Sequence, residues 1–480
     1  MLTLCSGRPE DCGIPTEAIE AFEGLLQKQK VRIHGYLMMS GKRIFAEHYY
    51  APYTKDSLHR MYSVTKSFVA LAVGLLLKNG QLSLDDKICD YFPDKLPEGG
   101  VHPWCAEMTI RDILSMRTCH GSTTYKNYNG DDWTESFFHV RPDHVPGTVF
   151  SYDTSAAHVL GALVEKLTGM KLLDYMRKEM LDELGFSKEA YILEDPVGVS
   201  QGGSGLMSTL RDVAAVAYLC NHYGVLDGNE LVPAEFMQET LKIQVPTDLQ
   251  PKLDEQYGYG YFFWMPREEG FTLFGMGGQL AVCFPKYDFC YVTMTDEIGN
   301  PAGVQALHDC FYNTVYPYLE KYEITQRIEQ IETVKLRGKP RRELTGIVSR
   351  DENLIRENTQ DCTYSFYPNH RNWEKVTFDW NHGEINFQIP AGEFRFSFGQ
   401  NTQQQFLNTG YRCECKGYWK LGHFILQCFV IDEELGNVQM DFAWKDSRLS
   451  VRIVSTDNLF IQDSELRKCF QGFASARRSP

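Results

Sequence analysis

Residues 59–81, which read HRMYSVTKSFVALAVGLLLKNGQ, decide the fold of this chain. Within them, residues 68–77 are apolar on every side, which predicts a helix buried inside the protein. The pair Asn79-Gly80 is typical of the end of such a helix. Ser63 and Lys66 stand at its start, and burying an ammonium group is costly unless it has partners. These two polar residues are therefore the first indication of function.

Ser63 and Lys66 are three positions apart, so they share one face of a helix. Partial burial disfavours the charged form of lysine, and a neutral amine can take the proton of a serine hydroxyl to make a nucleophile. The helix N-terminus adds a positive dipole where negative charge would develop. The structural alternative is an N-cap serine and a lysine that extends to solvent. No other serine in the chain has lysine three residues on, which favours the chemical interpretation.

The composition restricts the class of protein. The chain has 480 residues, 43% of them hydrophobic, which predicts a large core and two to three domains. A net charge of −15 makes nucleic acid and membrane surfaces poor partners. The longest apolar run is too short to span a bilayer, and the first residues lack the pattern of a signal peptide. The cysteine spacings do not suggest a disulfide scaffold, so we expect a soluble protein of the reducing cytoplasm.

Strand-like runs occur on both sides of a long helical block. Two of them, residues 33–39 and 43–50, precede the block, and aromatic strand-like runs return after Tyr257. This order predicts one domain whose first and last parts share a sheet.

A highly charged segment separates this part from the C-terminal part. It contains Gly338 and Pro340, which interrupt helices and strands, so we predict domains at residues 1–334 and 345–480. In the second domain, apolar residues alternate with polar ones, as in half-buried strands. The alternating apolar residues are Val376, Phe378, Trp380, Ile385, Phe387, Ile389, Phe394, Phe396, Phe398, Val438, Met440, Phe442 and Trp444. Several short strands of this kind predict a small antiparallel barrel or sandwich, which we take to be lipocalin-like.

The C-terminal part contains no catalytic cluster. The tripeptide CEC, from Cys413 to Cys415, could begin a metal site, but no nearby Cys or His in the sequence completes a tetrahedral set. Half-buried cysteines on a strand are the preferred interpretation, and we expect no metal ion and no cofactor. A Ser-His-Asp hydrolase is disfavoured, because GGSGL at residues 202–206 lacks the G-x-S-x-G spacing.

Several segments resemble one known family. Residues 61–93, MYSVTKSFVALAVGLLLKNGQLSLDDKICDYFP, resemble the nucleophile segment of the class C β-lactamase and penicillin-binding-protein superfamily of serine hydrolases. Residues 108–121, MTIRDILSMRTCHG, and 202–217, GGSGLMSTLRDVAAVA, resemble two later segments of that family. The resemblance covers roughly residues 14–320. It implies an antiparallel sheet flanked by helices, together with an all-helical region.

The resemblance also implies a second catalytic element. The family's Y-x-N motif matches the start of YDTSAAHVLGALVEKLTG, which places Tyr152 at the tyrosine position. A phenol near a cationic lysine can relay a proton to a leaving group. Thr154 stands where the family has asparagine, so a hydroxyl replaces the amide that usually contacts the substrate.

The third family element is K-T-G on a strand, and it matches TLFGMGGQLAVCFP at residues 272–285. Leu273 takes the place of the lysine and Gly275 that of the glycine. The resemblance implies that Met276 offers its backbone N–H as the second oxyanion donor, beside that of Ser63. Gly275 and Gly277 would let the strand approach a substrate closely.

Leu273 cannot bind a substrate carboxylate as the family's lysine does, so β-lactams and D-alanyl-D-alanine peptides become less favoured substrates. The "G-x-G-G-Q" form is most similar to the esterase and 6-aminohexanoate-dimer-hydrolase branch of the family. That branch cleaves small esters and amides.

Taken with the resemblance, the sequence predicts an α/β serine hydrolase of the β-lactamase/transpeptidase-like fold, with a C-terminal antiparallel β-barrel-like domain. Its expected partner is a small-molecule ester or amide, which acylates Ser63 while Lys66 and Tyr152 handle the proton. A homo-oligomer is left open. The alternative is a ligand-binding or sensor protein that keeps the fold and turns over little, which the replacements at Thr154 and Leu273 would favour.

Overall fold

The computed structural model of the chain describes residues 1–321, 350–390, 392–398, 403–406, 411–431, 435–455 and 471–479. Its helices are η1 (Pro9–Cys12), α1 (Thr16–Lys28), α2 (Val64–Lys78), α3 (Ile88–Tyr91), η2 (Pro93–Lys95), α4 (Pro103–Ala106), α5 (Ile110–Leu114), η3 (Thr124–Asn127), α6 (Trp133–His139), α7 (Thr154–Thr168), α8 (Leu172–Met176), η4 (Arg177–Leu181), α9 (Leu210–Asn221), α10 (Ala234–Thr240), η5 (Leu253–Glu255), η6 (Pro285–Tyr287), α11 (Pro301–Thr314) and α13 (Arg350–Thr359). Within the described ranges, no helix is both long and apolar enough to cross a membrane.

Among the described residues, the strands form two large sheets and two small ones. They are β1 (Cys5–Ser6), β2 (Ile33–Ser40), β3 (Arg43–Tyr49), β4 (His59–Arg60), β5 (Tyr191–Ile192), β6 (Leu206–Ser208), β7 (Val225–Leu226), β8 (Asn229–Glu230), β9 (Phe271–Gly275), β10 (Gln279–Phe284), β11 (Phe289–Thr295), β12 (Thr363–Phe366), β13 (Lys375–Asp379), β14 (Glu384–Ile389), β15 (Gly392–Ser397), β16 (Gln403–Gln405), β17 (Arg412–Lys420), β18 (His423–Ile431), β19 (Leu435–Lys445), β20 (Arg448–Ser455) and β21 (Gly472–Arg478).

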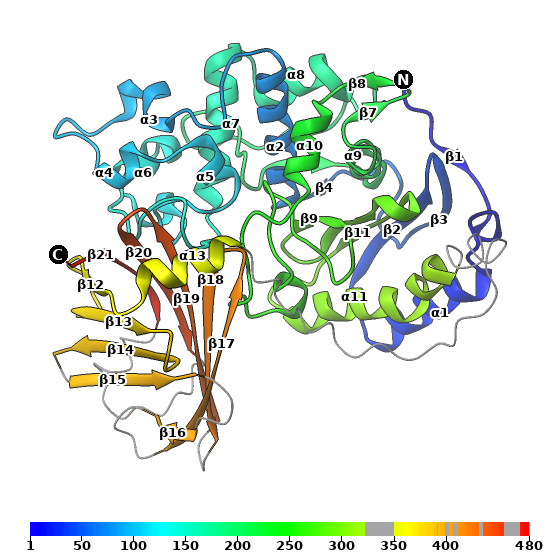
Figure 1. Ribbon diagram of the computed structural model, residues 1–480. Coiled ribbons are helices and arrows are strands. Elements are labelled where there is room, and N and C mark those ends of the chain that lie inside the picture. Colours follow the sequence, from blue (N-terminus) through cyan, green and yellow to red (C-terminus); the bar gives the residue numbers. More distant parts are fainter. Residues whose placement is uncertain are drawn as a thin grey trace. The chain divides into compact units, whose positions relative to one another are not determined.

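The first sheet joins strands from both sides of the helical block, in the order β1-β3-β2-β11-β10-β9. Its central pairing is between β2 and β11, which run antiparallel with Leu37 opposite Val292. The two strands are far apart in sequence but side by side in the ribbon (Figure 1). The expected sharing of one sheet by the first and last parts of this region is confirmed.

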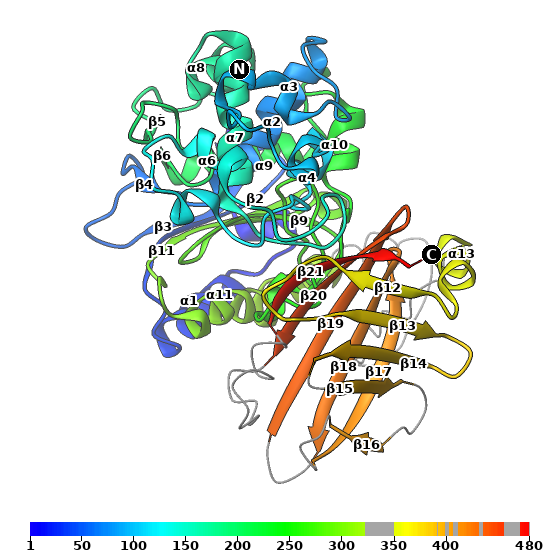
Figure 2. The same cartoon turned by 90° about the vertical axis from the view of Figure 1, so that its left-hand side faces the viewer.

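Helices cover both faces of this sheet (Figures 1 and 2). On one face α1 and α11 pack with the strands in a cluster rich in aromatic residues. Phe311 of α11, for example, stacks on Tyr291 of β11 with ring centroids 4.8 Å apart. On the other side, α9 contacts β2, β10 and β11, and α2 contacts β9. The apolar character of α2 follows from this position, because its residues from Val64 to Leu76 are all buried.

The chain divides into two compact units. The first comprises residues 1–86, 124–137 and 154–339, and the second comprises residues 87–123, 138–153 and 340–480. The boundary predicted between residues 334 and 345 lies outside the described residues. Two segments from the N-terminal half thus group with the C-terminal part, which the sequence analysis did not anticipate.

The second unit is built on a ten-stranded antiparallel sheet in the order β15-β14-β13-β12-β21-β20-β19-β18-β17-β16. All of its strands come from the C-terminal part, and they curl into a barrel-like form (Figure 1). Alternate residues such as Val376 and Phe378 on β13 are fully buried in one apolar core. The predicted alternation of buried and exposed strand residues is therefore confirmed.

Specific contacts join the two N-terminal segments of this unit to its sheet. The Arg448 guanidinium donates two hydrogen bonds to the carboxylate of Glu107, at 2.5 and 3.1 Å. The backbone N–H of Val145 donates to the Ser475 hydroxyl at 3.0 Å. His144 is buried and stacks on Phe473, with ring centroids 4.6 Å apart.

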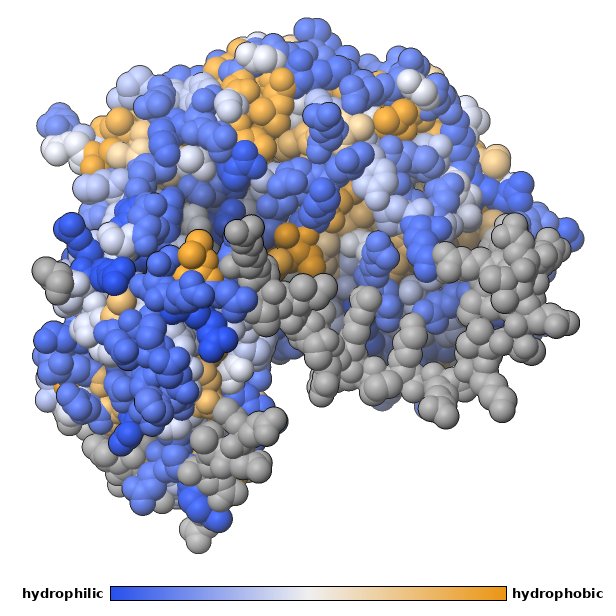
Figure 3. Space-filling view, in the orientation of Figure 1, coloured by the Kyte–Doolittle hydropathy of each residue, from blue (hydrophilic) through white to orange (hydrophobic). Residues whose placement is uncertain are grey.

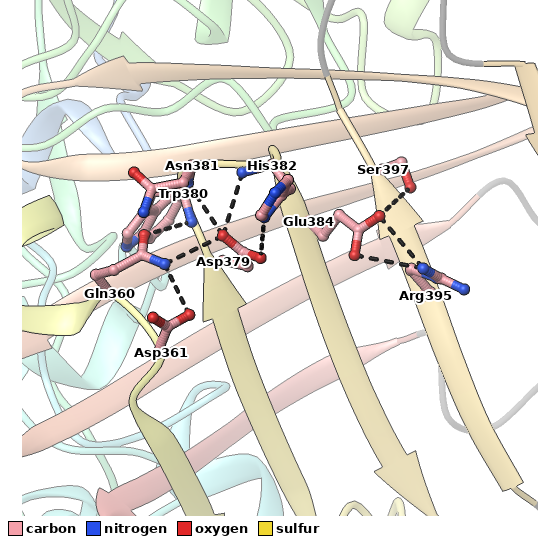
Figure 4. A network of polar contacts seen from close by, with 9 residues as sticks. All are labelled: Gln360, Asp361, Asp379, Trp380, Asn381, His382, Glu384, Arg395 and Ser397. Atoms are coloured by element: carbon pink, nitrogen blue, oxygen red, sulfur yellow. Dashed lines mark hydrogen bonds and ion pairs between the residues drawn. The ribbon is translucent and has the colours of Figure 1, made fainter.

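The polar face of the sheet carries its own hydrogen-bond networks (Figure 4). At the turn after β13, Asp379 accepts hydrogen bonds from the side chains of Gln360 and His382, which lowers the pKa of its carboxyl to about 2. On the next two strands, the Arg395 guanidinium donates to Glu384 at 3.3 Å. Hydrophilic residues cover most of the described surface on the side seen in Figure 3, with apolar residues in smaller patches.

Candidate active site

The backbone before α2 is held in a sharp turn that presents Ser63. Tyr62 has a left-handed φ of +47°, which is uncommon for a residue other than glycine. Two long-range bonds fix the turn: the N–H of Met61 donates to the carbonyl of Leu206 at 2.8 Å, and the N–H of Leu206 donates to the Thr65 hydroxyl at 3.0 Å. Uncommon backbone of this kind persists only where its surroundings hold it, and it clusters at functional sites.

The structural alternative for Ser63 and Lys66 does not account for how their side chains bond. Ser63 occupies the N-cap position of α2, but its side chain makes no capping hydrogen bond. Lys66 does not extend to solvent, because only 1% of its surface is exposed. Instead, the two side chains meet, and Lys66 Nζ donates to Ser63 Oγ at 2.8 Å.

Lys66 Nζ has further acceptors around it. It donates to the carbonyl oxygen of Gly203 at 2.6 Å and lies 3.5 Å from the Thr154 hydroxyl oxygen. The Ser63 hydroxyl, the Gly203 carbonyl and the Thr154 hydroxyl are thus all within hydrogen-bonding distance of this nitrogen. The buried amine is thereby fixed in position beside the serine hydroxyl.

Glycine at position 203 makes this arrangement sterically feasible. A Cβ there would lie 2.4 Å from Cγ2 of Thr154 and 2.7 Å from its carbonyl oxygen, which is closer than van der Waals contact allows. The loop therefore approaches the start of α7 only because residue 203 has no side chain. Sequence reasoning missed the Gly203 carbonyl as a partner of Lys66, although the resemblance of GGSGL to a family segment was a signal for this loop.

Gly275 brings the end of β9 against the nucleophile turn. A Cβ at Gly275 would lie 2.2 Å from the carbonyl oxygen of Met61, two residues before Ser63. The carbonyl of Gly275 accepts from the N–H of Gly278 at 3.2 Å. Because a trans peptide points its C=O and N–H in opposite directions, the N–H of Met276 points away from Gly278.

Side chains hold the turn that follows Gly275. Gln279 Nε2 donates to the carbonyl of Met276 at 3.2 Å, and the Thr295 hydroxyl donates to the carbonyl of Gly277. Gly277 has a φ of +84°, which explains the need for glycine here. Met276 is 48% exposed, so the turn is open to solvent on the side of this residue.

Leu273 does not present its side chain to solvent. It is fully buried and pairs with Ala281 on β10. Phe274 pairs with Leu280 and packs into the cluster beneath α1 and α11, so it lies on the other face of the sheet. These two side chains therefore do not form a shared surface for a substrate.

Tyr152 lies two residues before Thr154, at the boundary of the second unit, and its side chain is partly buried. Its ring centroid is 6.5 Å from that of Phe150. Convergence of its hydroxyl with Ser63 and Lys66 stays a prediction.

A histidine pair lies close to the nucleophile turn in sequence. His59 of β4 is four residues before Ser63, and its Nε2 lies 2.9 Å from Nδ1 of His34. Burial lowers the pKa of His59, and burial together with His59 lowers that of His34. The pair therefore favours the neutral state near pH 7, where it contributes a hydrogen bond without a charge.

Comparison with known proteins places the chain in a family. Residues 21–307 match the family model described as Beta-lactamase, so the chain belongs to the beta-lactamase family. The 6-aminohexanoate-dimer hydrolase of Paenarthrobacter ureafaciens is 24% identical over 223 residues, which cover 43% of this chain and 56% of that protein. The chain thus spans about half the length of this curated relative.

Solved structures share the fold. A putative 6-aminohexanoate-dimer hydrolase from Bacillus anthracis is 17% identical, with a TM-score of 0.51 over 65% of this chain and 83% of that one. The crystal structure of SurE with D-Leu is 16% identical, with a TM-score of 0.52 over 90% of this chain and 96% of that one. The family and fold that the sequence predicted are confirmed.

Proposed function

We propose that the protein is a serine hydrolase that cleaves a small ester or amide through an acyl-enzyme on Ser63. The observation that carries the proposal is the 2.8 Å hydrogen bond between Lys66 Nζ and Ser63 Oγ, made by a lysine that is 1% exposed. A buried amine fixed beside a hydroxyl is the arrangement that nucleophilic catalysis needs. Membership of the beta-lactamase family and the hydrolase names of its relatives support the same conclusion.

The chemistry proceeds in two acyl-transfer steps. Ser63 Oγ attacks the substrate carbonyl carbon, and its proton passes to Lys66. Tyr152 relays a proton to the leaving alcohol or amine, which departs and leaves an ester on Ser63. A water molecule then attacks this ester, its proton returns through the same groups, and the acid product is released. The N–H groups of Ser63 and Met276 stabilise the oxyanion in both steps.

The substrate class follows from the strand beside the site. Leu273 replaces the lysine with which penicillin-recognising relatives bind a carboxylate, and it is buried. A carboxylate that enters the site without a cation loses hydration and recovers little of that cost. Neutral acyl groups avoid this penalty, so short esters and amides with uncharged acyl chains are the expected substrates, and penicillins are poor ones.

Hydrolysis of p-nitrophenyl butyrate by the full chain tests the proposal. We expect turnover by the wild type and a loss of at least about 10³-fold in Ser63→Ala. Ser67→Ala is the matched control, because Ser67 is one turn further along the same helix and bonds to the carbonyl of Phe262 instead. Equal rates for Ser63→Ala and the wild type would refute the proposal, and the absence of any turnover by the wild type would favour the non-hydrolytic binding protein.

A further inference from the structure

Three cysteine thiols meet inside the barrel-like sheet. Cys413 and Cys415 lie two residues apart on β17, so they share one face of that strand. Cys428 on β18 is the direct cross-strand partner of Cys415. The three sulfur atoms lie within 4.8 Å of one another, and each residue is at most 1% exposed. The sequence pattern predicted half-buried cysteines and no further ligand here, but these cysteines are buried and the neighbouring strand supplies a third thiol.

The surroundings of this trio are apolar. Cys413, Cys415 and Cys428 belong to the buried core of the second unit, together with neighbours such as Leu426 and Val430. Because the strands are paired on both sides, the backbone holds the sulfur atoms in place without a bound ion. The donor set is therefore largely preorganised.

A metal ion binds cysteine in its thiolate form. Three sulfur atoms that converge on one point can therefore share one ion once their protons are released.

The spacing suits a three-coordinate ion. Sulfur atoms at about 2.3 Å from a central ion, spread evenly in a plane, are about 4 Å apart. Thiols within 4.8 Å of one another therefore need to move inward by no more than about 0.5 Å each. Among the described residues no fourth Cys, His, Asp or Glu belongs to the group. Zinc in a structural site takes four ligands, whereas soft Cu(I) is satisfied by thiolates alone.

We propose that Cys413, Cys415 and Cys428 form a trigonal thiolate site for a soft monovalent metal ion, Cu(I). Coordination releases the protons of the three thiols and changes no oxidation state. The site is separate from the hydrolase chemistry of Ser63, and it gives the C-terminal part a ligand-binding role of its own. It stabilises the second unit because the ion binds the folded arrangement of strands.

A chelator competition tests the site. The full chain, reduced, metal-free and free of oxygen, is titrated with Cu(I) in the presence of bathocuproine disulfonate, which is coloured when it holds Cu(I). We expect the wild type to keep about one equivalent of Cu(I) from the chelator. The Cu(I)-loaded protein should also unfold at a higher temperature than the metal-free protein. Cys428→Ser and Cys413→Ser should lose this equivalent, and Zn(II) should not displace Cu(I).

Two control variants separate this site from other thiols. Cys290→Ser removes a buried cysteine that is also paired across strands, with Cys283 in the first sheet, and it should retain the equivalent. A second converging group among the described residues consists of Cys105, Cys119 and His120. Cys119→Ser removes one member of this group, and the variant should still bind the equivalent of Cu(I).

Three results would overturn the proposal: a wild type that surrenders all copper, Cys428→Ser and Cys413→Ser variants that withhold as much as the wild type, or preferential binding of Zn(II). If both variants fail to fold, the wild-type titration and its unfolding temperature still decide the question.

Discussion

Gly275→Ala perturbs the proposed oxyanion site without changing a side chain that is assigned a part in the chemistry. The added Cβ would lie 2.2 Å from the carbonyl oxygen of Met61, and real Cβ atoms essentially never approach within 3.0 Å. The end of β9 must therefore retreat from the nucleophile turn by at least about 0.8 Å, the difference between these two distances. Met276, the next residue, retreats with it. A displacement of about 1 Å in a catalytic site can cost about 10²-fold in rate, which equals about 2.7 kcal/mol of transition-state stabilisation.

Initial rates with p-nitrophenyl butyrate measure this loss, and differential scanning fluorimetry reports any accompanying destabilisation. We expect kcat to fall about 10²-fold, with a modest loss of stability from overpacking. Gly24→Ala is the control, because a Cβ there meets nothing within 4 Å and Gly24 lies inside α1, where alanine is the better helix former. Gly24→Ala should keep wild-type activity. A Gly275→Ala enzyme with wild-type kcat and unfolding temperature would refute the assigned role of this strand end.

Three further predictions follow from the site and from the second unit. Lys66→Met should lower kcat by about 10²- to 10⁴-fold, since it removes the proposed acceptor of the Ser63 proton. A wild-type rate of p-nitrophenyl butyrate hydrolysis would contradict this. Tyr152→Phe should lower kcat by about 10²-fold with little change in KM, whereas an unchanged kcat would exclude the proton relay. Burial lowers the pKa of His144 from its ordinary 6.5 to about 3, and the positive charges of His120 and Arg452 act in the same direction. Below pH 6.5 the unfolded chain therefore binds a proton at His144 that the folded chain does not. The free energy of unfolding should fall as the pH drops from 6.5 toward 3, and at pH 5 it should be lower by about 2 kcal/mol. Urea unfolding at pH 5 and pH 7 should show a smaller difference for His144→Phe than for the wild type, and equal differences would contradict the assignment.

Local sequence patterns predicted the Ser63–Lys66 pair of the candidate site but not the residues that surround it. Ser63 and Lys66 meet because helical geometry brings positions i and i+3 together, and no other part of the chain is needed for that. The Gly203 carbonyl reaches Lys66 from 137 residues away, so only the tertiary structure places it. The face to which Leu273 points depends on its pairing with β10, which a motif match does not contain.

The second unit shows the same limit. The period-two alternation predicted its strands, because each has one buried face. Pairing between strands, however, put Cys428 beside Cys415, and a spacing rule along one strand could not find it. The grouping of residues 87–123 with the C-terminal sheet likewise rests on long-range contacts such as that between Glu107 and Arg448.

The central claim is that Ser63 is a nucleophile activated by Lys66. Intact-protein mass spectrometry after treatment with a fluorophosphonate probe tests it most directly, because such probes phosphonylate activated serine hydroxyls and leave ordinary ones unmodified. The account predicts one adduct per wild-type chain, located on Ser63 by peptide mapping, with no adduct in Ser63→Ala and much slower labelling in Lys66→Met. A wild-type chain that stays unlabelled, or an adduct on another serine that persists in Ser63→Ala, would contradict it.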